Sequence, residues 1–157
     1  MELRFAQTQD IPGILELLRQ VGQVHHLGRP DIFRSGAQKY DHDQVAAMLG
    51  DPANPIFVAV NEDRVLGYGF CFLKAFQNHP VMEDRRELYI DDICVDETCR
   101  GQHVGSALYD HICRYARTLK CQSVTLNVWR CNPGAVAFYE KLGMQVQKLG
   151  MEQKLGD

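Results

Sequence analysis

The stretch CRGQHVGSALYDHI, residues 99–112, leads into a helix without the residues that usually cap one. Apolar side chains recur at three- and four-residue spacing and predict a helix over about 103–119; they are Val104, Leu108, Ile112, Tyr115 and Leu119. Residues 100–103 include no Ser, Thr, Asp or Asn, and the first acidic residue of the helix is Asp110. The first backbone N–H groups of this helix therefore need an acceptor from elsewhere, either water or a bound anion.

An anion suits this stretch because a helix start carries unpaired N–H groups and a partial positive charge. Gly101 and Gly105 allow a ligand to approach the backbone closely, and Arg100 and His103 offer side-chain donors. The sequence has neither GxxxxGK[ST] nor GxGxxG, so neither a P-loop nor a Rossmann dinucleotide site is supported.

Composition excludes several classes of protein. The 157 residues fit one domain, 1–157, and the formal charge of −3 argues against a general nucleic-acid binder. The start MELRFAQTQD lacks the apolar h-region of a signal peptide, and no apolar run approaches the ~20 residues that cross a bilayer. The six cysteines are scattered without a CxxC pair, so we expect a cytoplasmic protein with free thiols, no metal site and no membrane contact.

The remaining pattern alternates between helices and strands. Helices are expected over 11–21, 43–49 and 132–143, and strands over 3–6, 56–60, 65–76, 87–95 and 123–129. Residues 24–40 are expected to be irregular, and the segments MQVQKL and MEQKL are expected to form two closing strands around Gly150. This mixed order favours an α/β domain built on one mixed sheet.

Two motifs resemble the GNAT superfamily of N-acetyltransferases. Gln102, Gly105 and Ala107 match the family element [QR]-x-x-G-x-[GA], preceded by the common Arg-Gly pair, although His103 stands where glycine is frequent. NPGAVAFYEKLGM, residues 132–144, is similar to the second family signature, N-x-x-A-x-x-F-Y-x-x-L-G-[FM]. The resemblance is strong over about residues 88–155. It implies a mixed, largely antiparallel sheet flanked by helices, with splayed central strands that hold acetyl-CoA.

The resemblance also implies residue roles. The pyrophosphate of coenzyme A would lie on the loop after residue 99, and the pantetheine arm would meet the backbone of Ile93 and Val95, with the Ile93 amide facing the thioester oxygen. The implied cofactor-binding residues are Ile93, Cys94, Val95, Arg100, Gly101, Gln102, His103, Val104, Gly105, Ser106 and Asn132. Tyr139 falls where many members protonate the departing sulfur, although a packing role would also explain it. Capping of the last helix would equally explain Asn132.

The general base is sought on the strand LYIDDICV. Strict alternation places Asp91 on one face with Ile93 and Val95, and Asp92 on the other face with Leu88, Ile90 and Cys94. We therefore assign Asp91 as the catalytic acid–base residue, acting through water or by binding the cation. A β-bulge in this strand would exchange the faces and favour Asp92, and a purely structural acid pair remains an alternative. No histidine–acid partner supports a covalent route through Cys94 or Cys99.

The acceptor is an amine of unresolved identity, either a small molecule or a protein. The family usually walls its acceptor site with the region after the first strand, here 22–40, where His25, His26, Arg29, Asp31 and Phe33 gather. Acidic residues at 83, 84 and 87 would suit a cationic acceptor. Because exposed final strands often mediate dimers in this family, the resemblance also implies a homodimer. The alternative to an enzyme is a non-catalytic acyl-CoA-binding regulatory module of the same fold, and a nucleotide at the anion site is a weaker third hypothesis.

Overall fold

The computed structural model describes residues 1–156 and divides the chain into two compact units, Met1–Asn127 and Val128–Asp157. In the first unit the helices and strands are β1 (Glu2–Phe5), the 3-10 turn η1 (Thr8–Asp10), α1 (Ile11–Gly28), α2 (His42–Met48), β2 (Ile56–Asn61), β3 (Arg64–Phe76), β4 (Arg85–Val95), the 3-10 turn η2 (Glu97–Cys99), α3 (Val104–Thr118) and β5 (Ser123–Leu126). The second unit contains α4 (Pro133–Lys141).

One five-stranded sheet organises the first unit. Its order is β1-β2-β3-β4-β5, and every neighbouring pair is antiparallel except β4 and β5, which run parallel. Residues 62 and 63 join β2 to β3, and the positive φ of 54° at Glu62 closes this hairpin. The expected mixed, largely antiparallel sheet is confirmed.

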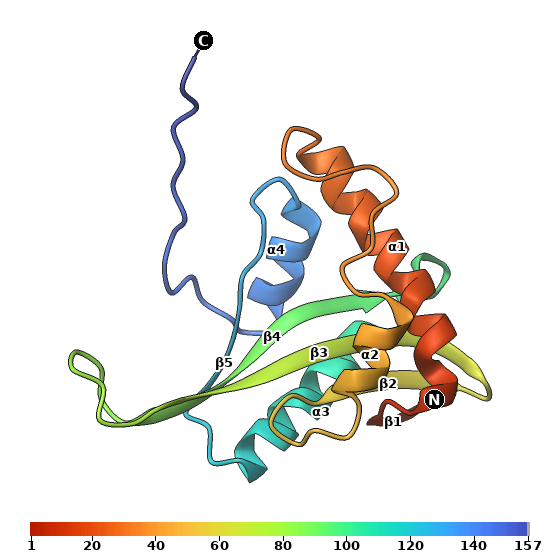
Figure 1. Ribbon diagram of the computed structural model, residues 1–157, viewed down its shortest axis with the longest axis horizontal. Coiled ribbons are helices and arrows are strands. Elements are labelled where there is room, and N and C mark those ends of the chain that lie inside the picture. The colour runs from red at the N-terminus through yellow and green to blue at the C-terminus, as the bar shows by residue number, and fades with distance from the viewer. Residues whose placement is uncertain (157) are drawn as a thin grey trace. The chain divides into compact units, whose positions relative to one another are not determined.

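Helices cover both faces of the sheet (Figure 1). On one face, Ile14 and Leu18 of α1 pack with Val58, Tyr68 and Phe70 of the sheet. On the other face, the apolar stripe of α3 packs against β2, β3 and β4 through Leu108, Ile112 and Ala116. Most of these side chains are fully buried. The two apolar clusters hold β4 between helical layers, as the site requires.

The largest differences from the sequence prediction are at the end of α1, at the end of β5 and in the closing segment. Helix α1 continues to Gly28, with His25 and His26 in its last turn, and the Arg29 backbone N–H donates to His25 O at 2.9 Å at the end of the helix. Strand β5 ends at Leu126 rather than at residue 129. The two closing strands are wrong: residues 144–156 form no strand within the described chain, and Val146, Leu149 and Met151 are exposed. The homodimer therefore remains a prediction without the strands that motivated it.

Candidate active site

Strands β4 and β5 part at the middle of β4. Their parallel pairing runs from Glu87↔Ser123 to Ile90↔Leu126, while β4 continues to Val95 beside β3. The ladder with β3 shifts register at this same point, because Phe70 opposes Asp92 while Cys71 opposes Ile90, which leaves Asp91 as the extra residue of a β-bulge. Since a bulge bends and twists its strand, it explains why β5 stops here. Residues 91–95 of β4 consequently form an open edge.

The N–H groups of this open edge point in a defined direction. Asp96 donates its backbone N–H to Leu66 O in the hairpin with β3, at 2.8 Å. Because successive N–H groups of a strand point to opposite edges, Cys94 directs its N–H toward β3, while Ile93 and Val95 direct theirs away from β3. These two amides, named in the sequence analysis, face the edge that β5 has left.

The bulge overturns the predicted alternation of side chains. Ile90 and Ile93 both pack toward α3, whereas Cys94 packs toward α1. Asp92 bonds to Tyr68 and Asp91 bonds to Tyr40, and both tyrosines pack with the α1 and α2 cluster. The acidic pair, Asp91 and Asp92, therefore shares one face, and the expected separation of these two residues is wrong. Strict alternation failed because the bulge inserts one residue between Ile90 and Asp92.

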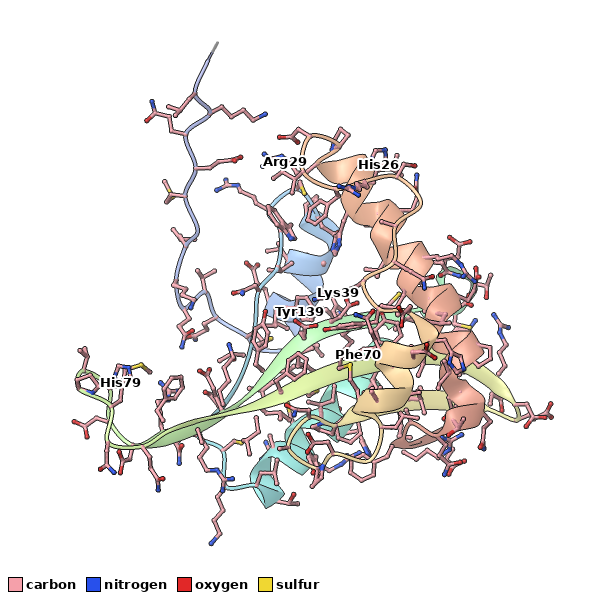
Figure 2. All side chains as sticks on the ribbon, in the orientation of Figure 1. His26, Arg29, Lys39, Phe70, His79 and Tyr139 are labelled. Atoms are coloured by element: carbon pink, nitrogen blue, oxygen red, sulfur yellow. The ribbon has the colours of Figure 1, made fainter. Side chains whose placement is uncertain are left out.

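Asp91 is the more accessible member of the acidic pair. Its Oδ2 accepts a hydrogen bond from the Tyr40 hydroxyl at 2.8 Å and lies 2.7 Å from Nζ of Lys39. The Tyr40 ring stacks on Phe70, with ring centroids 5.1 Å apart, which fixes the hydroxyl in place. Burial, followed by the bond to Asp91, raises the pKa of Tyr40, so this hydroxyl stays protonated and donates. Figure 2 shows Lys39 and Phe70 on this side of the sheet.

Asp92 lies deeper and accepts a 2.7 Å hydrogen bond from the hydroxyl of the fully buried Tyr68. Burial raises the pKa of Asp92, while the bond from Tyr68 and the charge of Lys39 oppose that shift. The acidic pair thus consists of one carboxylate, 15% exposed, that pairs with a lysine and a second, more deeply placed carboxylate that accepts from a neutral hydroxyl. Lys39 forms an ion pair with Asp91, and its charge lowers the pKa of Asp92 against the effect of burial.

The buried carboxylate makes the stability of the fold depend on pH. Between the ordinary aspartate pKa of about 4 and the raised pKa of folded Asp92, the folded chain holds more protons, so the free energy of unfolding falls as pH rises. Asp92→Asn removes this dependence and still offers an oxygen to Tyr68. We expect the melting temperature of Asp92→Asn, relative to wild type, to increase from pH 4 to neutral pH. A constant difference across this range would contradict the raised pKa.

The start of α3 has the open geometry that the sequence predicted. His103 precedes the helix with φ 62° and ψ 15°, no described side chain caps the helix, and its first turn holds no acid. The helical hydrogen bonds begin with Ala107 N to His103 O at 3.1 Å, which leaves the N–H groups of residues 104–106 ahead of the first bond. Gly101 also has a positive φ, 80°, with open space where a Cβ would lie. His103 adopts the backbone that glycine favours, and Arg100, Gln102 and His103 are exposed.

A short network holds this loop against the β2–β3 hairpin. Asp96 caps η2 by accepting from Thr98 N at 2.8 Å, and Arg64 reaches both Thr98 Oγ1, at 2.6 Å, and Asp96, at 3.3 Å. Ser106 uses its hydroxyl locally, donating to His103 O at 3.1 Å. The loop is thereby fixed at its entry, while residues 100–103 stay accessible.

Cys94 and Cys99, the two cysteines considered for a covalent route, are both buried. The Cys94 side chain is buried and directs Sγ toward Leu17 O at 3.6 Å, and burial raises its pKa to about 12. Cys99 is buried beside Val104. A thiol kept neutral by burial, as at Cys94, is a poor nucleophile, in agreement with the sequence argument against a covalent route. Any contact of Cys94 with an acyl donor would involve its backbone.

The two remaining site residues lie in the second unit. Asn132 caps α4 by accepting from Ala135 N at 3.3 Å, Pro133 stands in the first turn, and Gly143 follows the helix with φ 97°. Tyr139 lies on α4, half-buried, with its ring 5.3 Å from that of Phe138. The predicted cap of α4 is confirmed, and the roles of Asn132 and Tyr139 toward a ligand remain predictions.

Residues 22–40 were expected to line the acceptor site, and the end of this region contacts Asp91, through Lys39 and Tyr40. Arg29 pairs with Asp31 at 2.8 Å, and His26 Nδ1 lies 2.7 Å from Phe33 O, so these residues hold the end of α1 to its own loop. Figure 2 shows His26 and Arg29 in this region, with His79 at the tip of the β3–β4 hairpin. Asp84, near that tip, stands seven residues before Asp91, or about 23 Å along an extended strand. The acidic residues at 83 and 84 therefore do not line the approach to Asp91.

Sequence reasoning missed Lys39, Tyr40 and Tyr68. Lys39 and Tyr40 lie inside the region expected to wall the acceptor site, but they are about fifty positions from Asp91 along the chain and follow no local pattern. Tyr68 lies on a strand, where its sequence position indicates only an aromatic residue of the apolar core. A buried hydroxyl that requires a partner was the one signal that pointed toward a nearby carboxylate.

Acetyl-CoA fits the features of this unit. The uncapped N–H groups at the start of α3 suit a pyrophosphate, and the outward N–H groups of Ile93 and Val95 suit an amide-bearing arm. Within the described residues, no helix is long and apolar enough to span a bilayer, and no group of three or more His, Cys, Asp or Glu side chains could hold a metal.

The chain is similar in sequence and in fold to known proteins. Residues 22–144 match the model of the acetyltransferase (GNAT) family. The chain is 28% identical to thialysine N-epsilon-acetyltransferase of Bos taurus, over 91% of this chain and 83% of that protein. It is 25% identical to glucosamine 6-phosphate N-acetyltransferase of Trypanosoma brucei brucei, over 99% and 96%. A crystal structure of a mutant BH1408 protein from Bacillus halodurans superposes with a TM-score of 0.93 at 33% identity, covering 99% of each chain. The chain therefore belongs to the GNAT family and is an acetyl-CoA-dependent acetyltransferase.

Proposed function

We propose that this chain transfers an acetyl group directly from acetyl-CoA to a cationic primary amine. Asp91 holds the acceptor's ammonium group, the Ile93 amide donates to the thioester oxygen, and Tyr139 protonates the departing thiolate. Residues 100–106 hold the pyrophosphate. Asn132 borders the cofactor in addition to capping α4. Preorganised donors aimed at the developing oxyanion are the usual source of stabilisation in acyl transfer.

The observation that carries this proposal is the open edge of β4. It presents the N–H groups of Ile93 and Val95 where β5 has turned away, and the strand then runs through a short loop into the uncapped start of α3. One continuous stretch of backbone thus offers donors for an amide-bearing arm and for an anion. Direct transfer also agrees with the buried, protonated state of Cys94.

Charge around Asp91 favours a cationic acceptor. Two carboxylates share this face, and Lys39 forms an ion pair with one of them, Asp91. An approaching ammonium would therefore be attracted, whereas an acceptor carrying a phosphate would meet the charge of the acidic pair. Among the relatives, this supports the acceptor class of the thialysine enzyme over that of the glucosamine 6-phosphate enzyme.

The direct test is release of coenzyme A from acetyl-CoA across polyamines, aminoglycosides, amino acids with basic side chains, lysine-containing peptides and glucosamine 6-phosphate. We expect release with a cationic amine and none with the phosphorylated sugar. If acetyl-CoA raises the melting temperature but no amine promotes release, the non-catalytic acyl-CoA-binding module becomes the better assignment. Absence of any such stabilisation would remove the cofactor assignment.

Asp91→Asn tests the role of the carboxylate that pairs with Lys39. The amide keeps the shape of the side chain but loses its charge, so kcat/KM for a cationic amine is expected to fall by about tenfold or more, mainly through KM. The matched control is Asp84→Asn, an exposed carboxylate near the hairpin tip. A larger loss in Asp92→Asn than in Asp91→Asn would assign the role to the buried member of the pair.

A further inference from the structure

The side-chain amine of Lys39 already lies against Asp91, the carboxylate that we assign to binding of the acceptor amine. Its Nζ lies 2.7 Å from Asp91 Oδ2, the same oxygen that receives the Tyr40 hydroxyl. The lysine comes from the irregular segment between α1 and α2, and its side chain is 48% exposed, so it is tethered to the site without being packed into the core. Its Nζ also lies 5.7 Å from the centre of the Tyr40 ring.

The reach from Lys39 to the acyl donor is short. Asp91 precedes Ile93 by two residues, about 7 Å along a strand, and Ile93 is the residue whose amide we assign to the thioester oxygen. A lysine side chain has four methylene groups and a freely turning ammonium, so small rotations can carry Nζ from Asp91 toward that amide. The free chain therefore presents its own amine where an external amine is expected.

We propose that Lys39 is an acetyl acceptor of this protein, modified by the acetyl-CoA bound to the same chain when no other amine occupies Asp91. This inference rests on the function proposed above. The two proposals differ in the acceptor amine: an external molecule in the proposed function, and the side chain of Lys39 in this inference.

The step balances without a further reactant. The Lys39 ammonium loses one proton to solvent, its nitrogen lone pair forms a bond to the acetyl carbon, and the bond between that carbon and the coenzyme A sulfur breaks. The second proton leaves the nitrogen and ends on the thiolate. The products are N-acetyl-Lys39, coenzyme A and one proton in solution, with no oxidant or reductant required.

Acetylation would also change the site that it occurs in. The neutral amide can no longer pair with Asp91, so two carboxylates remain on this face without the charge of Lys39. An external ammonium then no longer competes with a tethered one. The modification is therefore expected to increase the affinity of the site for cationic amines.

The test uses the full chain with isotope-labelled acetyl-CoA, no added amine, and peptide mass spectrometry over time. Lys120, exposed at the turn after α3, is the internal reference for uncatalysed acetylation. We expect Lys39 to be labelled about 100-fold faster than Lys120, because Lys39 is held near the bound thioester, with a rate constant independent of protein concentration. Asp91→Asn should reduce the ratio of the two rates toward one while acetyl-CoA still raises the melting temperature.

Three results would overturn this inference. They are equal labelling of Lys39 and Lys120 in the wild type, an excess at Lys39 that persists in Asp91→Asn, and a rate constant that rises with protein concentration, which would indicate transfer between molecules. Coenzyme A release to the amine panel, measured on the same preparation, separates the two proposals. Release without selective Lys39 labelling rejects only self-acetylation, whereas absence of both release and labelling rejects the proposed transferase function as well.

Discussion

Replacing Gly105 with glutamate is expected to abolish acetyl-CoA binding. Gly105 is the second residue of α3, in the first turn, where the N–H groups precede the first helical hydrogen bond. A glutamate there brings bulk and a negative charge to the position that we assign to the pyrophosphate. The effect should appear as complete loss of the acetyl-CoA-dependent rise in melting temperature and of coenzyme A release.

This substitution allows binding to be separated from folding. An acidic side chain in the first turn of a helix interacts favourably with the helix dipole, so Gly105→Glu should fold at least as well as a neutral variant. Gly105→Gln is the matched control, because it adds nearly the same bulk without charge. We expect Gly105→Gln to weaken binding less than Gly105→Glu does. Unchanged affinity in a folded Gly105→Glu protein would remove the pyrophosphate from the start of α3.

The start of α3 could be predicted from sequence because its determinants are local. The missing cap, the absence of an acid and the glycines all lie within eight residues, and helix termini depend on such near neighbours. The apolar stripe of α3 and the cap of α4 were predictable for the same reason. The left-handed backbone at His103 was not, because residues other than glycine adopt it uncommonly and no neighbouring residue requires it.

The faces and partners of the acidic pair could not be predicted from the local sequence. The alternation rule gave opposite faces to Asp91 and Asp92, and a bulge reversed this by inserting one residue against β3. Whether a bulge forms depends on how the strand pairs with its partner β3, and that pairing is not encoded in the octapeptide LYIDDICV. The partners of the pair, Tyr40 and Tyr68, were equally hidden, because tertiary contacts across distant segments carry no sequence period.

The closing segment illustrates a different error. Alternating apolar residues over 144–155 suggest strands, but a strand is stable only when its backbone groups are paired. In the described chain this segment pairs with no strand, and its apolar side chains are exposed. The alternation of apolar residues predicted which side chains could share a face of a strand. It does not show whether another strand is available to pair with the backbone.

Replacing Tyr139 with phenylalanine is expected to lower kcat by about 100-fold, the usual scale for loss of a positioned general acid. The change removes one hydroxyl from α4 and keeps the aromatic ring that packs beside Phe138. If the hydroxyl protonates the departing thiolate, its loss slows breakdown of the tetrahedral adduct and leaves binding of acetyl-CoA intact. The dissociation constant of acetyl-CoA should therefore stay within about twofold of wild type.

A matched control separates this chemistry from packing. Tyr109→Phe removes the hydroxyl of a half-buried tyrosine on α3, outside the residues assigned to the site, and so measures the general cost of losing one such group. A tyrosine that only packs on α4 would give Tyr139→Phe the same small effect as Tyr109→Phe, with kcat unchanged. Loss of acetyl-CoA affinity in parallel with kcat would instead indicate a binding role. Only a fall in kcat at constant affinity supports proton donation, because that pattern requires an interaction made after the cofactor is bound.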